Sequence, residues 1–194
     1  MMTAMKPAVV LMVLALSCSS YAESKRYEID PEHLTVGFLV EHVGFAKVFG
    51  MFRDARGGFT FDEETSTISN VRVVVQTASV FTGVDARDQH LRSGDFLDVE
   101  TFPEMIFEAD RSVLENRKGT LGGRLTILGV TKPLVLAVTW NKSGESPLPG
   151  RPYVAGLSAR GSFARSEFGM TYGVLDGLVG ENIELIIELE AHRQ

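Results

Sequence analysis

The chain has 194 residues, of which 44% are hydrophobic, and this suits one domain with a sizeable buried core. Nineteen Lys and Arg against 25 Asp and Glu give a formal net charge of −6, and the basic residues form no cluster. This balance argues against nucleic acid as a partner and against attraction to an anionic membrane surface.

Residues 1–22 predict a secretory signal peptide. Lys6 is followed by the apolar run PAVVLMVLAL, and the small residues Ser20 and Ala22 stand two positions apart at its end. The apolar run is about ten residues long, well short of the roughly 20 needed to span a bilayer, and no later run comes close. We therefore expect cleavage after Ala22 and a soluble secreted protein of residues 23–194 with no transmembrane segment.

Cys18 is the only cysteine of the chain and falls inside this signal. It could instead be lipidated and tether the protein to a membrane, although Ala15, Leu16 and Ser17 before it make a poor lipoprotein box. If the signal is removed, the protein has no cysteine for a disulfide, for thiol catalysis or for a thiolate metal site.

Beyond the signal, apolar side chains recur at every second position, which is typical of strands with one buried face. In NIELIIELEA, Ile183, Leu185 and Ile187 share one such face. The other inward-facing sets are Val36/Phe38/Val40/His42, Phe59/Phe61, Val71/Val73/Val75, Met105/Phe107, Leu125/Ile127, Leu134/Leu136/Val138/Trp140 and a weaker run from Tyr153 to Phe163. These are about eight strands separated by turn-forming sequences, and they predict an all-β antiparallel barrel or sandwich. The stretch 35–54 is interpreted as the first long strand and the turn that leaves it.

Residues 81–103 lack this alternation. The stretch FTGVDARDQHLRSGDFLDVETFP is rich in charge, and its apolar residues Leu91, Phe96 and Leu97 are spaced irregularly. We expect short helices or a lid here.

No motif predicts catalysis, a metal or a cofactor. The four histidines, His33, His42, His90 and His192, form no HxxxH, HxH or HExxH pair, although a zinc or copper site built from distant residues stays open. There is also no GxSxG elbow, P-loop or dinucleotide fingerprint. What remains is the apolar interior, which in a barrel of about eight strands either is filled by side chains or holds one small ligand.

Several motifs occur in a distinctive order: DPEHLTVGFLVEHVGFAKVFGMF, GGFTFD, RDQHLRSGDFLDVETFPEMIFEA, GRLTILGVTKPLVLAV and ARSEFGM. From about Tyr27 to Glu190 the chain resembles the YceI-like family, also called polyisoprenoid-binding periplasmic proteins. The resemblance implies a lipocalin-like antiparallel eight-stranded β-barrel with short helical lid elements and a long hydrophobic channel. It implies a secreted, mainly periplasmic carrier of one isoprenoid lipid and implies no catalytic activity. We expect no cofactor, and a homodimer stays open.

The resemblance and the inward faces together give a set of expected ligand-binding residues. The expected apolar lining is Phe38, Val40, Phe52, Phe59, Phe61, Phe107, Leu125, Ile127, Leu136, Val138, Phe168, Ile183, Leu185 and Ile187. His42 follows Phe38 and Val40 on the same face and is expected to be a polar wall residue near one end of the channel.

The lid and the RSEFG motif supply the expected head-group residues. Arg87, Asp88, His90 and Arg165 match recurrent polar positions of the family, and the alternative is that they pin the lid and strand ends through ion pairs. Two other functions stay open at this point. One is a redox accessory protein or enzyme acting on a quinone-like lipid, with His42 or His90 handling protons. The other is a structural or interaction protein whose interior is only a packed core.

Overall fold

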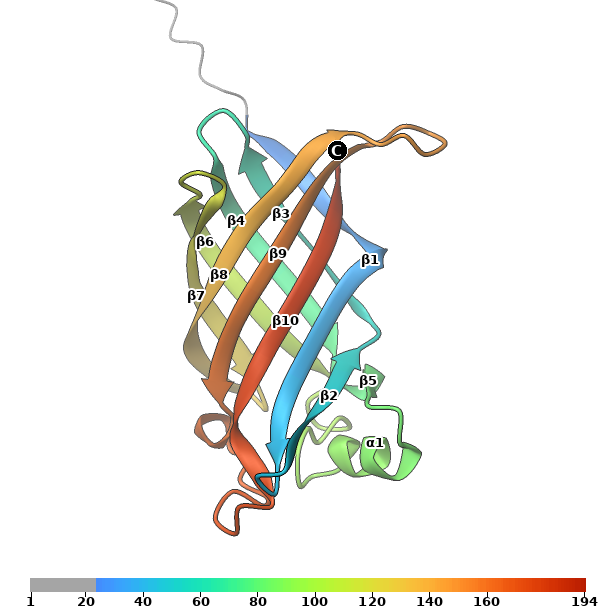
Figure 1. The fold of residues 1–194 in the computed structure, drawn as a ribbon, viewed down its shortest axis with the longest axis vertical. Helices are drawn as coiled ribbons and strands as arrows, with labels where there is room; N and C mark the ends of the chain where they lie inside the picture. Colours follow the sequence, from blue (N-terminus) through green and yellow to red (C-terminus); the bar gives the residue numbers. More distant parts are fainter. Residues whose placement is uncertain (1–23) are drawn as a thin grey trace, which may run out of the picture.

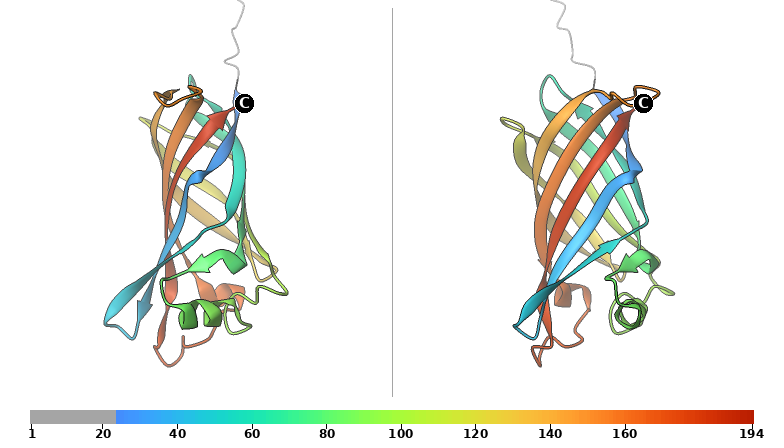
Figure 2. Two further views of the ribbon diagram at one scale, coloured as in Figure 1. Left: turned by 90° about the vertical axis from the view of Figure 1, so that its right-hand side faces the viewer. Right: turned by 45° about the vertical axis from the view of Figure 1, so that its right-hand side comes forward.

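A computed structural model describes residues 24–194, so the predicted signal peptide and Cys18 lie outside the described residues. Ten strands form one antiparallel sheet, and eight of them close into a barrel (Figures 1 and 2). The strands are β1 (Lys25–His42), β2 (Ala46–Phe52), β3 (Ala55–Asp62), β4 (Thr67–Gln76), β5 (Val80–Phe81), β6 (Glu104–Val113), β7 (Lys118–Ile127), β8 (Val130–Glu145), β9 (Tyr153–Ala164) and β10 (Val179–Arg193). The helical elements are α1 (Asp85–Arg92) and two 3₁₀ turns, η1 (Thr77–Ser79) and η2 (Arg165–Phe168).

The eight barrel strands are the eight segments that alternate in the sequence. Around the barrel they run β1, β3, β4, β6, β7, β8, β9 and β10, and β10 pairs back to β1. That closing ladder extends from Tyr27 opposite Arg193 to His42 opposite Val179. The predicted all-β, eight-stranded barrel is therefore confirmed.

β2 and β5 extend the sheet beyond the closed barrel. β2 pairs along the C-terminal half of β1, from Val36 opposite Phe52 to His42 opposite Ala46. The interpretation of residues 46–52 as part of the turn after the first strand is therefore wrong, because they form a second strand. Both Val43 and Gly44 have positive φ, which turns β1 tightly into β2, and valine rarely occupies this conformation.

The barrel has two different ends (Figures 1 and 2). The lid end consists of residues 81–103 with α1, the β1–β2 hairpin and the loop from η2 to β10, residues 169–178. The far end carries the start of β1, the end of β10 and the β8–β9 loop. No helix within residues 24–194 is long and apolar enough to cross a membrane.

Candidate functional site

A continuous apolar cavity runs inside the barrel. It contains about 1450 Å³ of empty space, counting the part that opens to solvent. Since successive side chains of a strand point to opposite faces, each barrel strand lines the cavity with residues of its inward face. On β10 these residues are Val179, Ile183, Leu185, Ile187 and Leu189.

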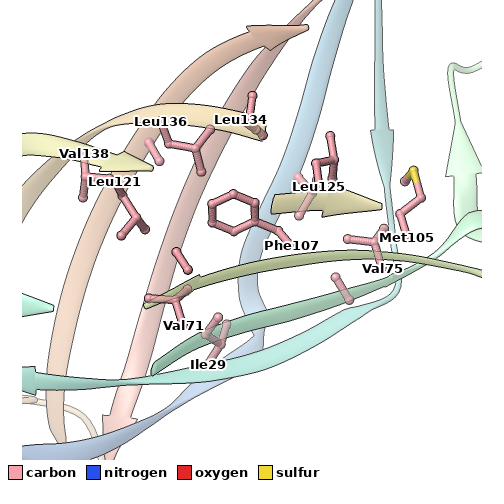
Figure 3. Packing of buried hydrophobic residues seen from close by; sticks show 14 of the residues in the cluster. Ile29, Val71, Val75, Met105, Phe107, Leu121, Leu125, Leu134, Leu136 and Val138 are labelled. Atoms are coloured by element: carbon pink, nitrogen blue, oxygen red, sulfur yellow. The ribbon is translucent and has the colours of Figure 1, made fainter. Parts of the chain in front are cut away.

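The middle of the cavity is shaped by Phe107 of β6. Figure 3 shows its ring projecting among side chains of β4, β7 and β8, including Leu125 and Leu136. Gly123 of β7 makes room for the ring, because a Cβ at that position would lie 2.6 Å from the Phe107 ring and closer still to the Glu108 carbonyl oxygen. The β6–β7 seam and the width of the cavity therefore both depend on Gly123.

Aromatic packing fills the barrel at the far end. Phe61 meets Trp140 edge to face, with ring centroids 4.9 Å apart, and also packs on Tyr27. The Tyr27 hydroxyl donates a hydrogen bond to Glu63 (2.7 Å), and the Tyr153 hydroxyl donates to the other oxygen of that carboxylate (3.1 Å). Burial first, and then the bond to Glu63, raise the pKa of Tyr27. None of these five side chains borders the cavity, so we interpret the group as a plug.

At the lid end the cavity is bordered by residues outside the barrel strands. Leu91, Phe96 and Leu97 come from the lid segment, and Met170 comes from the η2–β10 loop. The sequence shows that the three lid residues are apolar, but they have no regular spacing that predicts which way their side chains point. For Met170, nothing in the sequence except the ARSEFGM motif points to a place beside the cavity.

Arg165 also borders the cavity and is 1% exposed. Its guanidinium donates to the backbone carbonyl oxygens of Gly180 (2.8 Å), Met170 (2.8 Å), Tyr172 (2.7 Å) and Val179 (2.8 Å). Burial lowers the pKa of this group from its ordinary value. No carboxylate pairs with it among the described residues. Its hydrogen bonds hold the loop between η2 and β10 in place, and this loop shapes the lid end of the cavity.

Twelve of the fifteen predicted lining residues border the cavity, and three do not. Phe61 is part of the far-end plug. Phe168 is buried, but it packs behind the wall against Phe163, with ring centroids 5.3 Å apart. His42 is exposed at the last position of β1, so the expectation that it faces the channel is wrong. β1 pairs regularly with β2 through His42, but the register shift after Val40 places extra residues on β10, and His42 lies at the end of the strand outside the cavity lining.

The predicted head-group residues of the lid do not border the cavity. Asp88 accepts hydrogen bonds from the backbone nitrogen (2.8 Å) and hydroxyl of Thr82, and Arg87 donates to the hydroxyl (2.7 Å) and carbonyl (2.9 Å) of the same residue. His90 pairs with Asp95 (2.8 Å). These contacts fit the alternative role, in which the side chains pin the lid.

The cavity presents almost no polar chemistry. Apart from Arg165, every residue that borders it has a hydrocarbon or thioether side chain. Within residues 24–194 there is also no group of three or more His, Cys, Asp or Glu side chains placed to hold a metal ion. The arrangement can enclose a long apolar molecule by burial of hydrocarbon surface.

Known proteins share this sequence and fold. The family model for the YceI-like domain matches residues 27–191. Curated YceI proteins of Salmonella arizonae and Salmonella heidelberg are both 36% identical over 175 residues, which cover 89% of this chain and 90% of theirs.

Among solved structures, the YceI protein of Campylobacter jejuni has 30% sequence identity and a TM-score of 0.71, covering 79% of this chain and 90% of its own. A polyisoprenoid-binding domain from Saccharophagus degradans shares the fold at 14% identity, with a TM-score of 0.62 and coverage of 87% and 98%. The family match over residues 27–191 covers the lid and the barrel strands, except for two residues at the start of β1 and two at the end of β10. The chain therefore belongs to the YceI-like family.

Proposed function

We propose that this protein is a periplasmic carrier that holds one long isoprenoid chain, such as a polyisoprenoid or an isoprenoid quinone, in the barrel cavity. The observation that carries the proposal is the cavity itself, which runs inside the barrel and is lined by apolar side chains except for Arg165. Each CH₂ group buried there contributes about 0.8 kcal/mol, so a long chain gains affinity without specific polar contacts.

The length of the cavity favours a chain longer than an ordinary acyl tail. Val179 and Leu189 of β10 both border it. Ten residue steps at ~3.3 Å make ~33 Å along the strand, or ~25 Å along the axis of a barrel whose strands tilt by ~40°. One leaflet of a bilayer contributes only ~15 Å of hydrocarbon, half of the ~30 Å core. An isoprenoid chain of several units suits the longer space.

The two ends of the cavity set the direction of binding. The plug around Phe61 and Tyr27 fills the far end, so the chain enters from the lid end and its head group stays there. Of the four predicted head-group residues, Arg165 alone borders the cavity, and its guanidinium is occupied by backbone carbonyl groups. The head group is therefore expected at the mouth, where it keeps contact with water.

Two further observations support the carrier and its compartment. The Saccharophagus degradans domain that shares this fold is described as polyisoprenoid-binding. The apolar run after Lys6, with small residues at Ser20 and Ala22, fits export to the periplasm. The alternative, a redox accessory protein or enzyme, draws no support from the cavity, because His42 and His90 lie outside its lining.

A matched pair of substitutions on β8 tests the proposal. Leu136 faces the cavity and its neighbour Val135 faces solvent. Leu136→Trp places extra bulk in the space meant for the chain, whereas Val135→Trp adds the same ring outside. Added isoprenoid should raise the melting temperature of the wild type by about 5–10 °C when its concentration is about 100 times Kd.

Val135→Trp should show the same rise as the wild type, and Leu136→Trp should lose most of it. An equal rise in all three proteins would contradict a ligand inside the barrel. No rise in the wild type would favour an interior that serves only as core.

A further inference from the structure

Two neighbouring loops at the lid end expose large apolar side chains. Phe45, at the tip of the β1–β2 hairpin, is 91% exposed, and Leu175, in the η2–β10 loop, is 99% exposed. Val43 and Leu178 accompany them, and we call the four residues the apolar tip: Val43, Phe45, Leu175 and Leu178. Single exposed hydrophobic residues are ordinary, but four on two adjacent loops mark an interaction surface.

The two loops are held together. The backbone nitrogen of Val43 donates a hydrogen bond to the carbonyl oxygen of Leu178 (3.2 Å). Arg165 fixes the other side of the same loop through the carbonyl oxygens of Tyr172 and Val179. Figures 1 and 2 show both loops projecting past the barrel at the end that carries α1. The apolar tip is therefore a pre-formed surface.

The apolar tip is continuous with the cavity. β1 places Val40 in the cavity wall and ends one residue before Val43 of the apolar tip, and β10 begins with Val179 in the wall directly after Leu178. A molecule that leaves the cavity at the lid end therefore passes directly from the cavity wall to the apolar tip.

The charges around the apolar tip indicate which kind of surface it can bind. Glu41, Asp176 and Glu181 are exposed beside it, and the nearby Lys47 is already paired with Glu184. An anionic surface would be repelled, whereas a neutral one would not. Side chains that stand on projecting loops also suit a deformable medium such as lipid.

We propose that the apolar tip inserts into the surface of a neutral lipid bilayer and brings the mouth of the cavity against the membrane. This inference rests on the proposed carrier function, because it assigns the place where the isoprenoid chain is loaded and released. Insertion is shallow and driven by apolar burial, so it depends little on salt.

Flotation with phosphatidylcholine vesicles tests the inference on protein purified from its native compartment. The wild type should float with the vesicles. Phe45→Ser and Leu175→Ser should each lower the bound fraction about tenfold, since each removes one large apolar side chain from the lipid contact. The matched control is Leu148→Ser, which removes a 61% exposed leucine from the β8–β9 loop at the far end and should float like the wild type. The control has the same N-terminus as the other variants, so any N-terminal tether cancels in the comparison.

Two further measurements complete the test. Binding should persist in 0.5 M salt and should not increase when phosphatidylglycerol is added. A wild type that stays unbound, or a control that loses binding equally, would overturn the inference. So would a dimer that Phe45→Ser dissociates without any vesicle binding, because the apolar tip would then contact a second copy. Isoprenoid binding without vesicles should be unchanged in both tip variants, so a failure of docking is distinguishable from a failure of the carrier function.

Discussion

Gly123 offers a sharp test of how the barrel keeps its cavity open. A Cβ at this position would lie 2.6 Å from the Phe107 ring and would also overlap the Glu108 carbonyl oxygen. The ring borders the cavity, so we expect it to be displaced into that space, and the carbonyl belongs to a neighbouring strand that is hydrogen-bonded on both sides. Overpacking of this kind costs about 3 kcal/mol, the upper part of the usual range, because backbone must move. Gly123→Ala should therefore lower the melting temperature by roughly 6–12 °C in a chain of this size.

Gly122 is the control beside it. A Cβ there meets no heavy atom within 4 Å, so Gly122→Ala should leave the free energy of unfolding unchanged or raise it by up to about 1 kcal/mol. Denaturant unfolding gives the stabilities, and an isoprenoid titration of the folded proteins gives the affinities. Gly123→Ala should bind more weakly because Phe107 narrows the cavity. Equal stabilities for the two variants would refute the claim that the Phe107 ring leaves no room for a side chain at position 123.

Three other predictions follow from contacts outside the cavity. Arg165→Met should destabilise the protein by about 3 kcal/mol or more and expose residues 169–178 to proteolysis, because four carbonyl groups lose a buried donor, and Arg165→Lys should recover only part of the loss. Asp30→Asn should lower the melting temperature at pH 5.5 more than at pH 9. The Asp30 carboxylate accepts a hydrogen bond from His33, which raises the His33 pKa and lowers that of Asp30, so the stabilisation is present below the ordinary His pKa of about 6.5 and fades as pH rises through the raised value. Glu63→Ala should lower the raised pKa of Tyr27 in an ultraviolet titration, although burial will keep it above the ordinary value. Equal proteolysis of Arg165→Met and the wild type would contradict the role of Arg165. An Asp30→Asn variant whose melting temperature falls equally at both pH values would contradict the Asp30–His33 contact, and a tyrosine titration unchanged in Glu63→Ala would contradict the Tyr27–Glu63 contact.

The sequence predicts the barrel well because its signal is local. Period-two alternation orients each strand by itself, and the inward sets around Ile183 and Leu136 indeed border the cavity. The same alternation does not predict where along the barrel axis an inward-facing side chain lies. Phe61 alternates correctly with Phe59, yet it lies beyond the cavity in the far-end plug. Distance along the axis depends on register between strands that are far apart in the sequence.

Irregular backbone explains the other differences. His42 continues the alternation of β1 with Val40, but it lies at the last position of the strand, beside the register shift on β10, where the cavity wall has ended. β2 was not foreseen because its hairpin turns at Val43 and Gly44, where a valine with positive φ gives no recognisable turn signal. The lid residue Phe96 lies in a segment without regular periodicity, so only the folded chain shows which way its side chain points.

The central claim is that the cavity holds one long isoprenoid chain, and mass spectrometry of the organic extract tests it most directly. The wild type, Leu136→Trp and Val135→Trp would be purified in parallel from the native compartment without added lipid. The account predicts about one isoprenoid per wild-type and Val135→Trp molecule, and at least tenfold less with Leu136→Trp. Extracts without isoprenoid, or the same amount from all three proteins, would contradict it.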